Sequence, residues 1–388
     1  MKLSKDQKTL DQIAPLVEYA FLKKYDVRKD TNFMSRYNHS IGYGEFHDKK
    51  LQSYVMVNQF ENQVFDHKVK MAGIGYVASY PENRGHGDIT RIMKEILLDL
   101  HNNGVAISNL APWSETFYRQ YGYENAIYLK IYNIKPLMFR YFKAPKTGKL
   151  LRGRWSDPDL QKLVLDLYEK QLTSGEEQDT VIREKWWWER LTTYYPGRYT
   201  AVYVDENDVP QAYMFYRIIG NEFVAEELYS TNKAGALGIL SLIGSHISSC
   251  NNFKLIMPEN SFIEEYFPDQ EGITVNTVPY MMSRIVDVSL LLPCLKAQGS
   301  DNVNIEITDD RDCSWNNGIW NIAITSDNRI KCQKVDGKPD FKGTITDWTK
   351  VLLGRLSLKR AVKLNLIERT GSQPLEFEKG VISFYDYF

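Results

Sequence analysis

The chain has 388 residues, which is too long for one ordinary core and favours two or three domains. With 43% hydrophobic and 25% charged residues, the composition is that of a folded globular protein and excludes intrinsic disorder. The 48 Lys and Arg residues nearly balance the 49 Asp and Glu residues, so the field that steers proteins to nucleic acid or anionic membranes is missing. We therefore expect neither partner.

The N-terminus, the cysteines and the histidines argue against further classes of protein and of site. Residues 1–12 carry charges with no apolar stretch behind them, and no run approaches the roughly 18 to 20 apolar residues that a membrane helix needs. We therefore expect a cytoplasmic protein. The cysteines form no C-x-x-C pair and the histidines no H-E-x-x-H motif, so the sequence predicts no metal site.

The first elements read as a helix, a hairpin and a central strand. Residues 11–25 have helical periodicity, and residues 42–60 read as two strands joined by a polar turn at His47 to Lys50. The apolar run at residues 71–80 is typical of a strand that is covered on both faces.

Residues 81–93, PENRGHGDITRIM, place an arginine and two glycines directly before a helix. The helix is indicated by apolar residues on one face of a 3.6-residue period from Ile89 to Leu100, and it ends near Asn102 to Gly104. A second apolar run at residues 105–111 completes a strand, helix and strand unit with parallel strands. The loop thus lies at a strand's carboxyl end, where free helical N–H groups favour an anion.

On the residues alone, two interpretations of this loop stay open. Arg84, Gly85 and Gly87 can hold a pyrophosphate, or Asp88 can cap the helix while the glycines merely permit a tight turn. A carboxylate at the helix start competes with a bound phosphate, which favours the second interpretation. The spacing matches neither the G-x-G-x-x-G fingerprint nor the Walker A motif, which argues against a nicotinamide enzyme and a P-loop NTPase.

The next stretch, APWSETFYRQYGYENA (residues 111–126), favours the phosphate interpretation. A strand, an R-x-x-G loop, a helix, a second strand and then F-Y-x-x-x-G-Y resemble the acetyl-CoA core of the GNAT N-acetyltransferases. V-A-x-x-P-x-x-R before the loop, S-E-x-F-Y-R-x-Y-G-Y after it and an aromatic last residue resemble more narrowly the Eis (enhanced intracellular survival) type. Ile89 stands where the general GNAT loop has a small residue, and a larger apolar residue there is usual in the Eis type.

The resemblance implies transfer of an acetyl group from acetyl-CoA to a primary amine, as found in aminoglycosides, polyamines or lysine side chains. Tyr118 matches the family's general acid, and the family's general base is the carboxylate of the last residue, here Phe388. Without the resemblance, Tyr118 reads as one half-buried ring among 25 tyrosines. The cofactor-binding residues that the resemblance implies are Val77, Ala78, Ser79, Arg84, Gly85, His86, Gly87, Asp88, Ile89, Thr90, Ser114 and Glu115.

A second copy of the same pattern follows. Residues 199–218 again read as strand, acidic turn and strand after a helix-like segment at 158–171, so we interpret the chain as a duplicated fold. Residues 229–246 lack the R-x-x-G loop, and we expect this copy to have lost the cofactor. The consecutive tryptophans in WWWER (186–190) point in different directions on a helix, which favours packing over a ligand cage.

From residue 281 onward the pattern changes to short alternating runs. They predict an antiparallel sheet, and residues 347–366 predict a helix with Asp347 as its cap and Gly354 as a possible break. This part resembles the sterol-carrier-type module that closes Eis-type proteins, for which we expect a structural role rather than lipid transport. The predicted strands lie at 303–308, 320–325, 341–346 and 381–388.

The sequence therefore predicts an α/β (α+β) architecture of tandem GNAT folds with mixed sheets, the second copy degenerate, followed by a sterol-carrier-like domain. The predicted boundaries are 1–145, 146–284 and 285–388, and the last domain supplies the terminal carboxylate. The resemblance also implies a homo-oligomer, which is a hexamer in the family. The rival hypothesis is a coenzyme A or lipid binding module without turnover.

Overall fold

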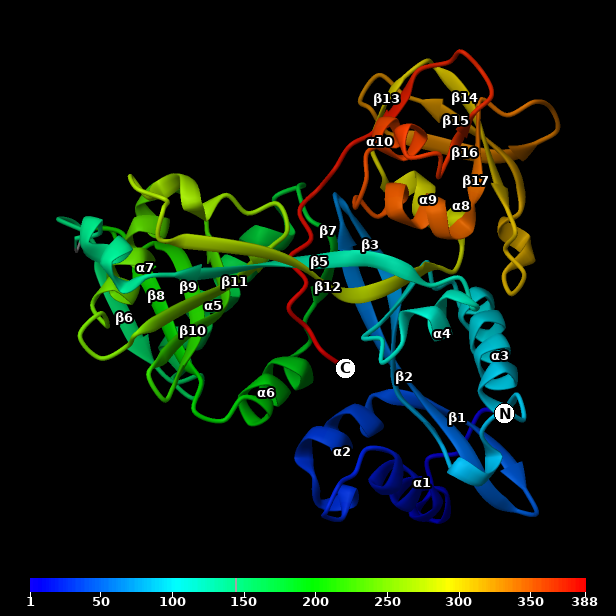
Figure 1. Cartoon of the computed structure of the whole chain (residues 1–388), viewed down its shortest axis with the longest axis horizontal. Coiled ribbons are helices and arrows are strands. Elements are labelled where there is room, and N and C mark those ends of the chain that lie inside the picture. The colour runs from blue at the N-terminus through cyan, green and yellow to red at the C-terminus, as the bar shows by residue number, and fades with distance from the viewer. Residues whose placement is uncertain (144) are drawn as a thin grey trace.

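The computed structural model describes residues 1–143 and 145–388 and shows two lobes that share one long sheet, with a smaller third unit beside them (Figure 1). Within the described residues this sheet has twelve strands. Its order is β1-β2-β3-β4-β12-β5-β11-β10-β9-β8-β6, and β7 pairs with β2. None of the helices in these residues has both the length and the apolar character needed to cross a bilayer.

The first lobe contains the predicted strand, helix and strand unit. β3 lies between β2 and β4 in the sheet, and β3 and β4 are parallel, as predicted. The helix between them ends at the expected position, with Asn103 as its C-cap. The elements are α1 (Gln7–Ala20), α2 (Thr31–Asn38), β1 (Ser40–His47), β2 (Lys50–Val64), β3 (His67–Ser79), α3 (Asp88–Asn102), β4 (Ile107–Leu110), α4 (Glu115–Arg119) and β5 (Glu124–Ile134).

The second lobe repeats this order, since its strands β10 and β11 are again parallel and again joined by a helix. This confirms the predicted duplication. The elements are β6 (Lys149–Gly153), α5 (Pro158–Leu172), β7 (Gln178–Ile182), α6 (Lys185–Tyr194), β8 (Tyr199–Val204), β9 (Pro210–Ile219), β10 (Glu222–Ser230), α7 (Lys233–Gly244), β11 (Asn252–Pro258) and β12 (Ile273–Ile285).

The two copies exchange their last strands. β12, which ends the second copy, lies between β4 and β5, whereas β5, which ends the first copy, lies between β12 and β11. Each copy thus completes the sheet of the other, and one hydrogen-bonded sheet runs through both. The predicted domain boundaries, 1–145, 146–284 and 285–388, divide the chain in sequence order, whereas the sheet mixes strands of the first two segments. These boundaries remain a prediction.

The third unit differs from the predicted antiparallel sheet, because β14 and β17 are parallel and the sheet is mixed. The helical segment does break at Gly354, whose φ is +75°, but its cap is Thr344 rather than Asp347. The elements are α8 (Val288–Leu291), β13 (Ala297–Gly299), β14 (Asn302–Thr308), β15 (Gly318–Ile324), β16 (Ile330–Val335), β17 (Phe341–Thr344), α9 (Ile345–Leu352), α10 (Leu358–Lys363), β18 (Glu368–Arg369) and β19 (Leu375–Phe377).

Residues 381–388 were expected to form the last strand of this sheet, and that prediction is wrong. They make a single isolated bridge, between Val381 and Glu177, and otherwise run as an extended segment. In Figure 1 this red segment leaves the third unit and crosses the sheet toward the middle of the molecule. Its buried polar groups find their partners in the second lobe, so the segment cannot stay with the sheet that precedes it.

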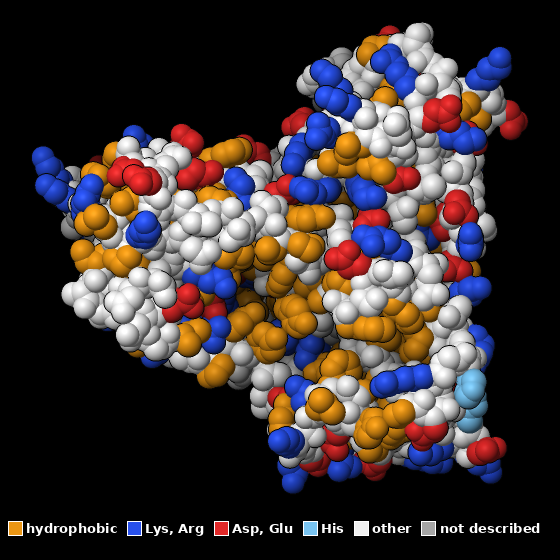
Figure 2. All heavy atoms as spheres, viewed as in Figure 1, with side chains coloured by type: hydrophobic (Ala, Val, Ile, Leu, Met, Phe, Trp, Pro, Cys, Tyr) orange, Lys and Arg blue, Asp and Glu red, His pale blue; other side chains and the backbone are white. Residues whose placement is uncertain are grey.

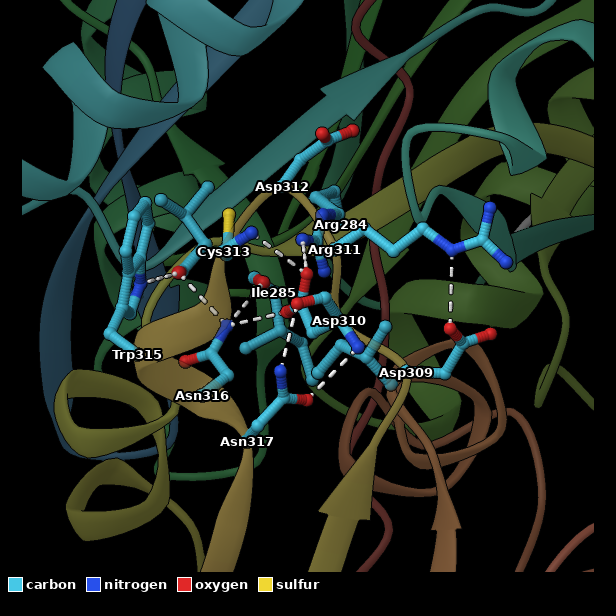
Figure 3. Close-up of polar contacts among 12 residues, drawn as sticks. Arg284, Ile285, Asp309, Asp310, Arg311, Asp312, Cys313, Trp315, Asn316 and Asn317 are labelled. Carbon is cyan, nitrogen blue, oxygen red and sulfur yellow. Dashed lines mark hydrogen bonds and ion pairs between the residues drawn. The ribbon is translucent and has the colours of Figure 1, made fainter.

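A buried polar cluster fastens the third unit to the end of β12 (Figure 3). Arg284 pairs with Asp310, whose carboxylate also accepts hydrogen bonds from Asn316 Nδ2 at 2.9 Å and from the Cys313 backbone at 3.0 Å. The guanidinium also lies against Gly122, where a Cβ would stand 2.8 Å from its Cζ atom. The glycine of the F-Y-x-x-x-G-Y motif therefore makes room for an arginine.

The tryptophans of α6 pack as predicted. Trp186 stacks on His39 of the first lobe with ring centroids 4.1 Å apart, and Trp187 is fully buried. Trp188 lies in the core of the second lobe. Trp187 also lies edge-on to Phe60 of the first lobe at a centroid distance of 4.9 Å, so Trp186 and Trp187 join the two lobes.

Candidate active site

One cavity of about 990 Å³ holds most of the predicted site residues. In Figure 2 a hollow lies where Figure 1 marks the C-terminus, and hydrophobic and Lys or Arg side chains gather around it. The predicted residues that line the cavity are Val77, Ala78, Ser79, Arg84, Gly85, Gly87, Asp88, Ile89, Thr90, Tyr118 and Phe388.

The loop before α3 has the backbone that an anion site requires. Gly85 and Gly87 have φ values of +84° and +78°, a left-handed region that favours glycine. Gly87 is the N-cap of α3 and has no side chain to accept from the free N–H groups of the first turn. A Cβ on Gly85 would meet nothing within 4 Å, so a ligand has space to approach. These features fit a diphosphate.

Asp88 does not cap the helix, so that part of the alternative interpretation is wrong. It is the first residue of α3, and it is only 2% exposed. Its carboxylate accepts hydrogen bonds from Arg91 Nη2 at 2.5 Å and Ser53 Oγ at 3.1 Å, and His47 Nε2 lies 3.1 Å away. Because Arg91 offsets its charge, Asp88 competes with a phosphate less than the sequence indicates.

β3 offers a free backbone edge next to this loop. It pairs with β4 only from Met71 to Ile74, although it continues to Ser79. A bulge interrupts its pairing with β2, and Tyr76 there has a φ of +48°. Residues 75–79 therefore line the cavity, and on the β4 side their N–H and C=O groups pair with no strand of the part of the chain that the structure describes. An extended ligand that carries amides could form hydrogen bonds with these groups.

Tyr118 reaches the cavity from α4. Ser114 accepts a hydrogen bond from the Phe117 backbone at 3.3 Å and so begins this short helix. Tyr118 is 3% exposed, and burial raises the pKa of its phenol well above the usual value near 10. The hydroxyl is therefore protonated at neutral pH and can act as a proton donor.

Phe388 lies against two glycines of β3. A Cβ on Gly73 would stand 2.8 Å from the Phe388 ring, and a Cβ on Gly75 would stand 3.1 Å from its carboxyl carbon. Any larger residue at either position would push the last residue away. Sequence analysis missed these contacts of Gly73 and Gly75 with the last residue, although the G-x-G spacing within a strand was a visible signal.

The second lobe holds the final segment in place. Arg183 contacts Asp386 at 2.8 Å and Glu227 at 2.8 Å, and all three side chains are almost completely buried. Burial raises the pKa of Glu227, but the charge of Arg183 outweighs this and holds it below its usual value. Trp187 Nε1 donates to Asp386 at 2.6 Å, and the Tyr280 hydroxyl donates to the Asp386 carbonyl at 3.2 Å. The degenerate copy thus positions the end of the chain.

Known proteins resemble this chain in sequence and in fold. Two family models described as acetyltransferase (GNAT) domains match residues 4–126 and 180–285, and one described as a sterol carrier protein domain matches residues 291–379. A solved structure from Enterococcus faecalis V583, described as a conserved protein of unknown function and probable N-acyltransferase, is 30% identical. It superposes with a TM-score of 0.89 and covers 100% of this chain and 98% of that chain. The chain belongs to the GNAT acetyltransferase family.

Two more distant structures share the complete fold of this GNAT enzyme. A GCN5-related N-acetyltransferase from Anabaena variabilis ATCC 29413 is 17% identical with a TM-score of 0.84, and each chain is covered over 100%. Eis1 from Mycobacterium abscessus is 16% identical with a TM-score of 0.80, with 100% of this chain and 99% of that chain covered. A search of curated proteins finds no match. The predicted tandem GNAT fold with a sterol-carrier-like third domain is confirmed.

Three residues predicted to bind the cofactor do not line the cavity of this GNAT enzyme. The His86 carbonyl accepts from Arg91 Nη1 at 3.1 Å. Ser114 caps α4, and Glu115 pairs with Arg119 at 3.0 Å. Among the described residues, no group of His, Cys, Asp or Glu side chains lies together in a way that could hold a metal ion.

A further buried carboxyl group, outside the cavity, lies where the two lobes of the GNAT enzyme meet. Asp179 on β7 accepts hydrogen bonds from Asn62 Nδ2 at 2.6 Å and from Asn109 Nδ2 at 3.0 Å. Burial raises its pKa from 3.8 to about 6. The folded state therefore favours the protonated form, and this contribution to stability is lost as the pH rises through about 6.

Replacing Asp179 by Asn is expected to stabilise the protein at pH 7.5, by about 1–3 kcal/mol. The neutral amide removes the buried charge, and its N–H can pair with the Oδ1 atom of Asn62 or Asn109, both of which lack a partner. Urea unfolding should show a gain that shrinks toward pH 4. Asp386→Asn is the matched control with the opposite sign, because it weakens a buried ion pair. A variant less stable than the parent at pH 7.5 would contradict this account of Asp179.

Proposed function

We propose that the protein transfers the acetyl group of acetyl-CoA to a primary amine, in the manner of the Eis type, with Tyr118 as general acid and the Phe388 carboxylate as general base. The observation that carries the proposal is that one cavity contains the glycine loop, Tyr118 and the last residue. A module that only binds lipid or coenzyme A has no need for a buried phenol and a terminal carboxylate in the same space.

The glycine loop and the edge of β3 would hold the cosubstrate. Arg84, Gly85 and Gly87 lie where the N-terminus of α3 attracts the diphosphate, and the backbone of residues 75–79 would pair with the amides of the pantetheine arm. When bound, acetyl-CoA supplies an activated acyl group and a thiolate leaving group.

In the proposed reaction, Phe388 and Tyr118 carry out the proton transfers. The Phe388 carboxylate, ionised at neutral pH, takes one proton from the ammonium group and passes it to solvent. The neutral nitrogen attacks the thioester carbonyl carbon, the new C–N bond forms and the C–S bond breaks. Tyr118 donates its proton to the departing thiolate and regains one from the nitrogen. The sum is an ammonium ion and acetyl-CoA giving an N-acetyl amide, coenzyme A and one proton.

The experiment that tests the function is release of thiol from acetyl-CoA in the presence of an amine panel. The panel should contain amino acids, simple alkyl and aryl amines, a polyamine and an aminoglycoside. Thiol release that requires an amine, together with one acetylated product per thiol, supports the proposal. Tight binding of acetyl-CoA with no amine-dependent release for any amine would instead support the binding-module hypothesis.

Replacing Arg84 by Gln is expected to raise the Kd for coenzyme A about tenfold, since a charge-assisted hydrogen bond to phosphate contributes about 1.4 kcal/mol or more. The kcat at saturating acetyl-CoA should change less than about twofold, because Arg84 does not touch the reacting atoms in this proposal. Calorimetric titration gives the Kd. Lys94→Gln, on the helix that follows the glycine loop, is the matched control, because Lys94 does not line the cavity. Equal Kd values for the two variants would remove Arg84 from the phosphate site.

A further inference from the structure

The side of the cavity away from the glycine loop is where an acceptor amine must enter. It is formed by the end of α1, the start of the following loop, α2 and the end of the chain. Its walls are largely aromatic, with Phe21 edge-on to Tyr76 at a centroid distance of 5.1 Å. The residues that line it are Ala20, Phe21, Lys23, Arg36, Tyr76, Tyr194, Tyr387 and Phe388. This surface suits an apolar or aromatic body.

Arg36 brings an almost buried positive charge to this wall. It is 7% exposed, its Nε atom donates to the Asn32 carbonyl at 3.3 Å, and its Nη2 atom donates to the Tyr76 hydroxyl at 2.5 Å. Its guanidinium also lies 4.5 Å from the centre of the Tyr76 ring. All of these partners are neutral, and among the residues that the structure describes Arg36 forms no ion pair. A buried cation without a counter-ion is unfavourable, and an anion bound in the cavity would relieve this.

Lys23 is a second cation on the same wall. It is partly buried, and within the described ranges it likewise forms no ion pair. Both cations act on the Tyr76 hydroxyl: burial raises its pKa, and the charges of Arg36, Lys23 and Arg190 oppose that rise. The one acidic group that acts with burial is Asp30, which caps α2, accepts a hydrogen bond from the Tyr25 hydroxyl and does not line the cavity. Arg36 thus contacts the Tyr76 hydroxyl directly, and Lys23, whose Nζ atom lies 5.8 Å from the centre of the Tyr25 ring, lines the same cavity.

Few acidic side chains line the cavity to balance the positive charges of Arg36 and Lys23. The only acidic side chain among the described lining residues is Asp88, which lies at the phosphate end and is engaged by Arg91. Two acidic residues of the first lobe, Asp26 and Glu45, pair with Arg28 at 2.8 Å and with Arg91 at 2.8 Å and do not line the cavity. The remaining negative charge is the carboxylate of Phe388, which the proposed reaction uses as its base.

From these charges we infer that the acceptor is an amine that also carries a carboxylate on an apolar or aromatic body, such as an amino acid, and not a polycation. The substrate carboxylate pairs with Arg36 and Lys23, and the ammonium group lies toward the Phe388 carboxylate. A polyamine or an aminoglycoside would instead bring several positive charges to a wall that already holds two. The inference rests on the proposed function, whose acceptor site it describes.

The test compares amines that differ only in the carboxylate. L-phenylalanine and phenethylamine, and L-leucine and isoamylamine, are assayed by thiol release at saturating acetyl-CoA beside spermidine and kanamycin. We expect kcat/KM to be at least about tenfold higher for the amino acid in each pair, since a charge-assisted contact contributes about 1.4 kcal/mol or more. The polycations should be the poorest acceptors.

Substitutions show which residues bind the carboxylate of the acceptor. Arg36→Gln should raise the KM for the amino acid about tenfold and leave the KM of its decarboxylated partner within about twofold. Because Arg36 is buried and its variant could fold poorly, Lys23→Gln serves as a second variant, with an expected rise of about threefold. Lys24→Gln is the matched control, because Lys24 is the next residue and does not line the cavity. Melting temperatures show whether each variant is folded.

The outcomes separate this inference from the function on which it rests. If spermidine or kanamycin is acetylated faster than both amino acids, the inference is overturned while the transferase function stands. An Arg36→Gln variant that loses kcat equally for all amines, with KM unchanged, would place Arg36 on the terminal carboxylate and also overturn the inference. If no amine in the panel releases thiol, the proposed function fails and the inference falls with it.

Discussion

Replacing Tyr118 by Phe is expected to lower kcat by about 10²–10⁴-fold while the Kd for acetyl-CoA changes less than about twofold. The substitution removes one hydroxyl from a side chain that is 3% exposed, so the ring still fills its place. What is lost is the proton for the departing thiolate. Steady-state kinetics and calorimetry on the same preparation give the two numbers.

Tyr121→Phe is the matched control for this prediction. Tyr121 lines the same cavity, and its hydroxyl lies 2.9 Å from Thr90 Oγ1, so the substitution removes the same group from a neighbouring ring. It should affect kcat several-fold at most. Since burial raises the pKa of Tyr118, the activity of the parent enzyme should also show no descending limb between pH 8 and pH 9.5. Equal loss of kcat and of acetyl-CoA affinity in the Tyr118→Phe variant would indicate a structural tyrosine instead.

Adding one glycine after Phe388 is expected to lower kcat by about 10²-fold or more and to leave the melting temperature within about 2 °C. The extra residue moves the carboxylate by up to about 3.6 Å, away from the position that Gly75 leaves open. The cavity of about 990 Å³ has room for one glycine, so the fold has no reason to change. Thermal unfolding and thiol release are the measurements.

A semisynthetic chain that ends in the Phe388 amide is the control that separates position from charge. It keeps every atom of the side chain in place and removes only the negative charge, so its kcat should fall as far as that of the extended chain. If either variant keeps the parent kcat, the terminal carboxylate is not the base, and a water or another group must accept the proton.

Much of the fold can be predicted from local pattern in the sequence. Apolar spacing from Ile89 to Leu100 predicts α3 to within two residues of its observed bounds, because one helix face must be buried whatever it packs against. The left-handed φ values of Gly85 and Gly87 likewise follow from what only glycine tolerates. Duplication is visible for the same reason, since each copy repeats its own local periodicity.

The errors arose where a residue's partner lies far along the chain. Residues 381–388 alternate like a strand, but Asp386 pairs with Arg183, and that contact draws the segment out of its own domain. Asp88 looks like a cap until His47, Ser53 and Arg91 are seen to hold it. The contacts with Arg183, His47 and Ser53 leave no trace in the local sequence, whereas Arg91 lies only three residues after Asp88.

The sequence by itself determined the kind of elements in this GNAT enzyme, their order and the glycine loop before α3, because helix periodicity and glycine conformation act over a few neighbouring residues. Only the tertiary structure showed the exchange of β5 and β12, the route of the terminal segment and the position of Lys23 and Arg36 on one wall of the cavity. These features depend on which distant groups satisfy one another once buried, and the free energy of that pairing is defined only after the chain has folded.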